Sequence, residues 1–260
     1  MVAKVWSDVS GTGEDIVVLH GWGLNGAIWT PVQDELARLG RLTRLDLPGY
    51  GESPWPPERP LNFTQLCELT LDALPARCHL IGWSLGGLVA TQLALQAPAR
   101  VASLTTVASS PYFPAEPPAW PGIEPSILSQ FGKQLSKDFR RTVERFLALQ
   151  SLGSPHAKQD VKAIKEWLFS KPMASVEVLD AGLDMLAEVD LREQLQQLTL
   201  PFLRIYGRLD ALVPSTVAEQ VDRLAPHSER FIAPQCSHAP FISAPETFCE
   251  VWREFFLRVR

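Results

Sequence analysis

The sequence contains no long apolar run, little cysteine and little excess charge. It has no stretch of the roughly 18 apolar residues that a membrane helix needs, and residues 1–8 lack the apolar core of a secretion signal. The four cysteines form no C-x-x-C pair, which indicates no zinc site and favours free thiols in a reducing compartment. A net charge of −5 argues against a nucleic-acid binder. We therefore expect a cytoplasmic protein with no metal, no membrane contact and no nucleic-acid partner.

An α/β pattern covers both ends of the chain. Strand-like and helical runs alternate through residues 15–110, and the alternation returns after residue 201. The runs that predict strands lie at 16–19, 42–46, 78–81, 101–107, 202–206 and 230–233. The runs that predict helices lie at 29–39, 63–74, 85–94, 216–224 and 246–257. Such alternation predicts an α/β fold with a mostly parallel central sheet and helices on both faces.

The middle of the chain follows a different pattern. Six prolines between residues 111 and 125 indicate a stiff connection. From 126 to 190 apolar residues recur at helical spacing, and breaks near 153–155 and 171–172 predict three helices. We therefore expect an α/β core of residues 1–110 and 191–260, interrupted by a helical lid insertion at 111–190 on the side where ligands bind.

One pentapeptide indicates the chemistry. Gly82-Trp83-Ser84-Leu85-Gly86 has the pattern Gly-x-Ser-x-Gly and lies between a predicted strand and a predicted helix. In that context a sharp turn lifts the serine hydroxyl out of the sheet and makes it a nucleophile. The pattern alone also fits an ordinary strand-to-helix turn. The hypothesis therefore needs a base, an acid and an oxyanion hole elsewhere in the chain.

A base and an acid follow the serine in the expected order. Asp210 comes after the strand at 202–206, and His238 comes after the strand at 230–233. Because the carboxyl ends of parallel strands gather at one edge of a sheet, both side chains can converge on Ser84. A histidine can take the serine proton near neutral pH, and the aspartate can fix its tautomer. We predict a catalytic triad of Ser84, His238 and Asp210.

Four other residues are weaker candidates for these roles. His20 lies at a strand end before a glycine turn, which favours a structural role. Asp46 precedes the serine in the chain, and Asp190 lies outside the returning core. Cys236 is two residues from His238, but nothing near it in sequence would lower the pKa of its thiol. We interpret Cys236 as a packing residue.

The oxyanion hole is expected from two backbone N–H groups. One belongs to Leu85, directly after the nucleophile, and the other comes from the loop after an early strand. That loop reads His20-Gly21-Trp22-Gly23. Its glycines let the backbone turn an N–H inward, so Trp22 is the predicted second donor.

The predicted insertion is basic in an acidic chain. Residues 133–171 carry nine basic and four acidic side chains, a charge of +5 in a chain of −5. Arg141 and Arg145 are one helical turn apart, as are Lys158 and Lys162, so each pair shares one helix face. Like charges so placed suit an acidic partner, and a solvated helix face accounts for them equally well.

Together these motifs resemble a known family. The triad order and the run Asp46-Leu47-Pro48-Gly49-Tyr50-Gly51-Glu52-Ser53 give nearly the whole chain a resemblance to the α/β-hydrolase fold family. Within that family, the chain is similar to the biotin-pathway carboxylesterases in the segments 20–25, 82–90, 107–111, 138–150 and 237–243. The similarity includes the predicted insertion, where generic hydrolases differ most.

The resemblance implies a reaction, a partner and site residues. The reaction is hydrolysis, without a cofactor, of the methyl ester of a pimeloyl chain on acyl-carrier protein by a monomeric serine esterase. The implied substrate-site residues are Trp22, Ser84, Leu85, Phe146, Leu147, Ala148, Leu149, Gln150 and His238. The implied carrier-docking residues are Arg141, Arg145, Lys158 and Lys162. The last two are lysines at positions where the family pattern favours arginine, and a lysine keeps the charge but lacks the bidentate geometry of arginine.

Two alternatives stay open on the residues alone. One is a lidded serine hydrolase of small free esters, or of carbon–carbon bonds, that uses no carrier protein. The other is a hydrolase-fold receptor that binds a small ligand and turns it over slowly. Enzymes of this fold that use an aspartate nucleophile are disfavoured, because the chain has Ser84 at that position.

Overall fold

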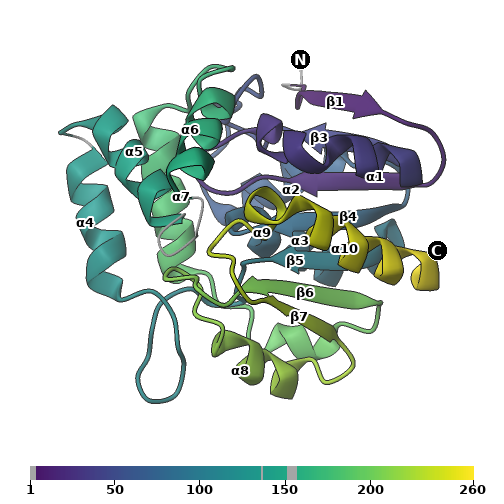
Figure 1. Ribbon diagram of the computed structural model, residues 1–260. Helices are drawn as coiled ribbons and strands as arrows, with labels where there is room; N and C mark the ends of the chain where they lie inside the picture. Colours follow the sequence, from purple (N-terminus) through teal and green to yellow (C-terminus); the bar gives the residue numbers. More distant parts are fainter. Residues whose placement is uncertain (1–3, 136, 151–156) are drawn as a thin grey trace.

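A central sheet with helices on both faces organises the molecule (Figure 1). The computed structural model describes residues 4–135, 137–150 and 157–260. The described strands are β1 Ser7–Ser10, β2 Asp15–Leu19, β3 Arg41–Leu45, β4 Cys78–Trp83, β5 Val101–Val107, β6 Phe202–Gly207 and β7 Glu229–Ala233. Their order in the sheet is β1-β3-β2-β4-β5-β6-β7. The predicted α/β fold with a mostly parallel sheet is confirmed.

The register of the strands brings their carboxyl ends to one edge. Leu19 on β2 pairs with Gly82 on β4, and Trp83 pairs with Val107 on β5. At the other side Gly207 on β6 pairs with Ala233 on β7. The loops that follow these strands therefore start level with one another, so side chains far apart in sequence meet above the sheet.

The sequence pattern missed one edge strand. β1 pairs antiparallel with β3, with Ser7 opposite Leu45, and its residues alternate between exposed and half-buried. Three of its four residues are polar and its one apolar side chain, Val9, is exposed. An edge strand that buries so little carries no hydrophobic pattern that sequence reasoning can detect.

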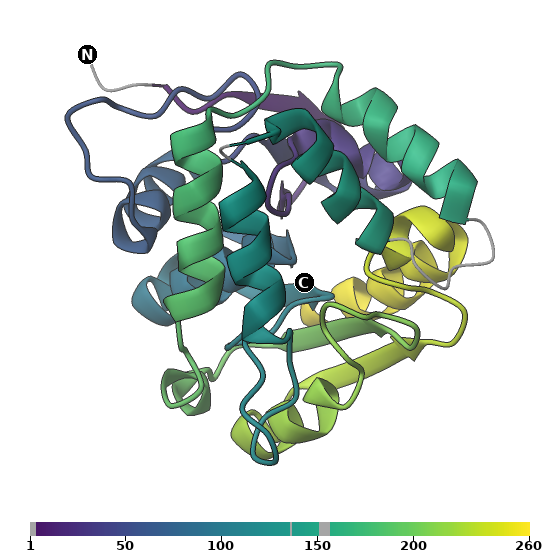
Figure 2. The same ribbon diagram turned by 90° about the vertical axis from the view of Figure 1, so that its left-hand side faces the viewer.

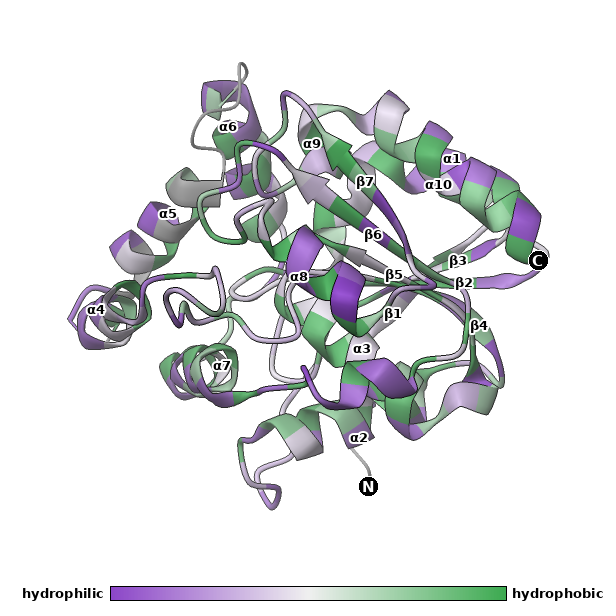
Figure 3. Ribbon diagram, turned by 90° about the horizontal axis from the view of Figure 1, so that it is seen from below, coloured by the Kyte–Doolittle hydropathy of each residue, from purple (hydrophilic) through white to green (hydrophobic). Residues whose placement is uncertain are grey.

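Helices cover the two faces of the sheet (Figure 3). On one face lie α1 Gln33–Leu39, α9 Pro240–Ser243 and α10 Pro245–Val259, and on the other lie α2 Phe63–Ala73, α3 Leu85–Gln96 and α8 Val217–Leu224. Short 3-10 helices, η1 Gly26–Val32, η2 Pro98–Arg100 and η3 Gln194–Gln197, complete the core. The helix predicted at 29–39 thus starts as η1, in which the Asn25 side chain accepts a hydrogen bond from Ala27 N. Within the described ranges, no helix has the length and hydrophobicity to cross a bilayer.

In the part of the chain that the structure describes, four helices lie between β5 and β6, over the carboxyl ends of the strands (Figure 2). They are α4 Pro125–Leu135, α5 Phe139–Gln150, α6 Ala157–Leu168 and α7 Val176–Glu188. We call residues 111–190 the helical insertion. The prediction of three helices was wrong at one break, between α4 and α5. Asp138 caps α5 there, because its carboxylate accepts from Arg141 N at 3.1 Å and its carbonyl accepts from Thr142 N.

Candidate active site

Ser84 lies in a strained turn between β4 and α3. Its φ is 55° and its ψ is −120°, a backbone conformation that non-glycine residues rarely adopt. Two hydrogen bonds hold it: Ser84 N donates to Val107 O at 2.9 Å, and Ser109 Oγ donates to Ser84 O at 2.8 Å. A Cβ at Gly82 would lie 2.2 Å from the Gly86 carbonyl oxygen. The two glycines of the motif are therefore needed for the turn to close.

The three predicted triad residues form one chain of hydrogen bonds. His238 Nε2 lies 3.0 Å from Ser84 Oγ, and His238 Nδ1 lies 2.8 Å from Asp210 Oδ2. All three are buried, with exposed fractions of 3% for Ser84, 1% for His238 and 6% for Asp210. His238 thus lies between Ser84 and Asp210 in the order that a serine nucleophile, its base and an orienting acid would require.

Backbone N–H groups hold the Asp210 side chain, and the Trp83 side chain holds the His238 backbone. Asp210 Oδ1 accepts from Leu212 N at 2.8 Å and from Val213 N at 3.0 Å, which leaves Oδ2 for the histidine. Trp83 Nε1 donates to the His238 carbonyl oxygen at 2.7 Å. The end of β4, next to Ser84, therefore also holds the backbone of His238.

The loop of residues 20–23 packs directly against Ser84. A Cβ at Gly21 would lie 3.2 Å from Ser84 Cβ, so the loop and the turn are in close contact. The Trp22 side chain is fully buried, and its Nε1 donates to Leu179 O on α7 at 2.8 Å. Leu85 begins α3, where an N–H has no acceptor within the helix and the helix dipole favours negative charge. Leu85 directly follows Ser84, and Trp22 directly follows the glycine that contacts Ser84, so the two-donor oxyanion hole stays a prediction that this packing supports.

The weaker candidates have other roles in the structure. The His20 ring is buried, its Nε2 accepts from Leu47 N at 2.9 Å, and burial lowers its pKa to about 4. Asp46 forms an ion pair with Lys171, and Asp190 forms one with Arg192. Burial raises the pKa of the Cys236 thiol, which disfavours the reactive thiolate. None of these side chains replaces a member of the triad.

The predicted substrate residues on α5 are described only in part. Leu147 is buried and Ala148 is exposed. The side chains of Phe146, Leu149 and Gln150 lie outside the described residues. A Cβ at Gly23 would lie 4.0 Å from Val143, one turn before Leu147 on α5. The buried face of α5 therefore faces the loop that carries Trp22.

The four predicted docking residues are exposed on α5 and α6. Arg145 Nη1 donates to Gln134 Oε1 at 2.9 Å, and Lys162 lies 3.9 Å from Glu166 with 81% of its side chain exposed. Arg141 and Lys158 are exposed as well. Because they are exposed, these cations are accessible to a partner. Solvated ion pairs of this kind contribute little to the stability of the fold.

Two contacts of the helical insertion with the core were not foreseen. Asn25 Nδ2 donates to the carbonyl oxygens of Trp167 and Leu168 at the end of α6, and Lys171 reaches Asp46. The sequence marks Lys171 only as one of the basic residues of 133–171 and as the residue before a helix-breaking proline. Its ion pair joins positions 125 residues apart, and no local pattern indicates it. Among the described residues, no three His, Cys, Asp or Glu side chains gather as a metal site would require.

Comparison with known families agrees with this geometry. Residues 16–245 match the family described as alpha/beta hydrolase fold. The chain belongs to that family. An esterase from Exiguobacterium antarcticum superimposes with a TM-score of 0.86 over 97% of this chain and 95% of its own, at 21% identity. At that identity the likeness shows the shared fold alone.

Curated relatives within the family are much closer in sequence. The pimeloyl-[acyl-carrier protein] methyl ester esterase of Aeromonas salmonicida is 50% identical over 245 residues, which cover 94% of this chain and 96% of the relative. The protein of the same name from Vibrio vulnificus is 53% identical over 239 residues, 92% of each chain. The match therefore spans the core and the helical insertion together. The family match and these relatives confirm the resemblance that the sequence motifs predicted.

Proposed function

We propose that this protein is a serine carboxylesterase that hydrolyses the methyl ester of pimeloyl-[acyl-carrier protein], yielding methanol and the free carboxylate. The observation that carries the chemistry is the hydrogen-bonded chain of Ser84, His238 and Asp210. The relatives that share about half of its residues over nearly the whole length are named for this substrate. Their names support the substrate, and the geometry supports the type of reaction.

The proposed mechanism passes through an acyl-enzyme. Ser84 Oγ attacks the ester carbonyl carbon while His238 Nε2 takes the hydroxyl proton, and the backbone N–H groups of Trp22 and Leu85 bind the oxyanion. His238 then gives the proton to the leaving methanol oxygen. Water, activated by the same ring, releases the carboxylate and restores Ser84. Asp210 keeps the proton on Nδ1 throughout, which leaves Nε2 free to accept.

The helical insertion is proposed to act as the lid and to select the substrate. Ser84 is almost completely buried, so the pimeloyl chain must reach it beneath the insertion. The apolar face of α5, with Leu147, suits a polymethylene chain, for which each buried CH₂ contributes roughly 0.8 kcal/mol. Phe146, Ala148, Leu149 and Gln150 complete the proposed site. We further propose that the protein is a monomer and that it acts in the cytoplasm, a reducing compartment that suits its free cysteines.

The exposed cations of α5 and α6 are proposed to dock the acidic carrier. Arg141, Arg145, Lys158 and Lys162 are exposed on α5 and α6, whereas the triad is buried. They act on encounter rather than on chemistry, because exposed charges steer association and are screened by salt. Carrier-bound ester and free ester should therefore respond differently when these charges are changed.

The test is a charge reversal measured on two substrates. Arg141→Glu with Arg145→Glu should lower kcat/KM for the carrier-bound methyl ester by about tenfold or more. Hydrolysis of a short free ester, such as p-nitrophenyl butyrate, should stay within about twofold of wild type. The carrier reaction should also slow as salt is raised, since a Debye length of about 10 Å at 0.1 M shrinks further.

A matched control reverses two exposed arginines outside the insertion, Arg223→Glu with Arg253→Glu, which changes the net charge equally. This variant should keep both activities. Equal loss on both substrates in the α5 variant would contradict carrier docking. A wild type that cleaves only the free ester would instead indicate the hydrolase of small esters, and one that cleaves neither would contradict esterase function.

A further inference from the structure

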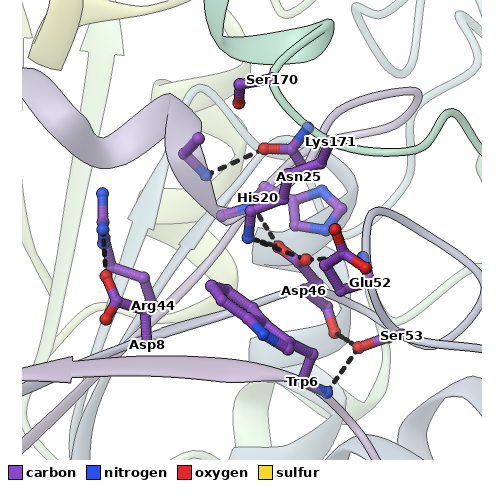
Figure 4. Close-up of polar contacts among 12 residues, drawn as sticks. Trp6, Asp8, His20, Asn25, Arg44, Asp46, Glu52, Ser53, Ser170 and Lys171 are labelled. Carbon is purple, nitrogen blue, oxygen red and sulfur yellow. Dashed lines mark hydrogen bonds and ion pairs between the residues drawn. The ribbon is translucent and has the colours of Figure 1, made fainter.

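A buried ion pair joins the helical insertion to the core. Lys171, in the segment between α6 and α7, places Nζ 3.0 Å from Asp46 Oδ1 and 2.9 Å from Oδ2. The Asp46 side chain is fully buried and that of Lys171 is only 12% exposed. The ammonium also lies 3.2 Å from the centroid of the Trp6 ring, a favourable cation–π contact. Figure 4 shows these side chains together, just beyond the end of β3.

The Asp46 carboxylate is also a junction for two backbone loops. Its Oδ1 accepts from Gly26 N at 2.7 Å, and its Oδ2 accepts from Glu52 N at 2.9 Å. Gly51, with a φ of +54°, approaches so closely that a Cβ there would lie 2.3 Å from Oδ2. A buried carboxylate that loses its cation is left uncompensated. The positions of Gly26 and Glu52 therefore depend on the charge that Lys171 supplies.

Two side chains of the loop of residues 20–26, which we call the oxyanion loop, form hydrogen bonds to the helical insertion. Gly26 is next to Asn25, whose Nδ2 bonds the carbonyl oxygens of Trp167 at 3.3 Å and Leu168 at 3.2 Å. Trp22 Nε1 bonds Leu179 O on α7. The end of α6, just before Lys171, thus contacts one end of this loop, and α7 contacts its centre.

His20 connects the same junction to the start of the oxyanion loop. Its Nε2 accepts from Leu47 N, directly after Asp46, so the ring must be neutral at that nitrogen. Burial lowers the pKa of His20 to about 4, the Asp46 charge opposes that shift, and the Lys171 charge favours it. Lys171 therefore helps to keep the His20 ring neutral. The hydrogen bond between that ring and Leu47 N anchors the end of β2, just before Trp22.

We propose that Lys171 is a positioning residue for ester hydrolysis: by pairing with Asp46 it fixes the oxyanion loop and sets the Trp22 N–H beside Ser84. This inference rests on the proposed function, because it concerns the oxyanion hole of that reaction. It assigns to one lysine of the insertion a role in transition-state stabilisation that is separate from substrate docking. Such an effect changes kcat, because oxyanion donors act mainly when charge develops in the transition state.

The experiment compares Lys171→Met with Lys171→Arg on p-nitrophenyl butyrate, a free ester that needs no carrier. Methionine is one heavy atom shorter than lysine and removes the charge, and with it both the ion pair and the cation–π contact with Trp6. We expect kcat to fall by about tenfold to a hundredfold, since a misplaced donor loses part of its effect, while KM changes by less than about twofold. Arginine, which restores the charge, should recover most of kcat.

Two further variants separate positioning from folding. Arg41→Met removes an exposed ion pair with Asp15 at the opposite end of β3 and should leave kcat unchanged. Asp46→Asn with Lys171→Met removes both buried charges, so thermal stability should recover relative to Lys171→Met while kcat stays low. Recovery of kcat together with stability would overturn the inference, as would wild-type kcat in Lys171→Met. Those results leave an active wild type, whereas an inactive wild type overturns the proposed function itself.

Discussion

Replacing Asp210 with asparagine tests the proposed triad through one proton. Asp210 Oδ1 accepts from the N–H groups of Leu212 and Val213. In Asp210→Asn the amide oxygen must stay at these two donors, because an NH₂ group there would face N–H groups only. The NH₂ group then points at His238 Nδ1, which becomes the acceptor. The ring proton moves to Nε2, and the base can no longer take the proton of Ser84.

The expected loss is large because the wrong tautomer removes general-base catalysis while the oxyanion hole stays in place. A change of this kind lowers kcat by about 10⁴-fold, which corresponds to a rise in the activation barrier of about 5 kcal/mol. The assay is hydrolysis of p-nitrophenyl butyrate near neutral pH, with thermal unfolding measured in parallel to confirm that the variant folds.

A matched control uses the same substitution elsewhere. Asp190 is a partly exposed aspartate paired with Arg192, and Asp190→Asn should keep kcat within about twofold of wild type, as expected for a surface ion pair. A folded Asp210→Asn variant that keeps more than a tenth of wild-type kcat would contradict this role of Asp210. In that case His238 would not depend on Asp210 for its tautomer.

Two further changes probe the groups around the site. The pKa of folded His20 is about 4 and lies below its ordinary value of 6.5, so the unfolded chain binds the proton first. The stability that this group contributes is complete above pH 6.5 and is lost as the pH falls toward 4, by up to about 3 kcal/mol. In His20→Gln, urea unfolding should show a pH dependence shallower by about that amount, and equal curves would contradict the assignment. A Cβ at Gly207 would lie 1.8 Å from the Ser237 carbonyl oxygen, so Gly207→Ala should displace the loop of His238 and lower kcat by about 10²-fold. Unchanged kcat in that variant would show that the loop shifts without moving the base.

The core of the fold could be predicted because its signals are local. Short apolar runs alternate with helical runs, and each buried strand of the parallel sheet is marked by its own residues. The site could be predicted for a related reason: Ser84, Asp210 and His238 each follow such a run, and parallel strands end at one edge of the sheet. Topology then brings together side chains that lie 154 residues apart.

The features that sequence reasoning missed depend on tertiary contacts. β1 buries too little to show a pattern, and the break between α4 and α5 rests on a single cap at Asp138. The pairing of Lys171 with Asp46 depends on how α6 and α7 meet the oxyanion loop, which neither residue signals by itself. The division of the chain at residues 110 and 190 stays a prediction, as does the assignment of catalytic roles to the site residues.

The mass of the carrier protein after reaction tests the proposed esterase function itself. Acyl-carrier protein bearing pimeloyl methyl ester would be incubated with wild type and with Ser84→Ala, and its intact mass followed over time. Wild type should convert the methyl ester to the carboxylic acid, leave the chain attached to the carrier and release methanol, while Ser84→Ala should leave the mass unchanged. Loss of the whole chain from the carrier, or equal conversion by Ser84→Ala, would contradict the proposed function.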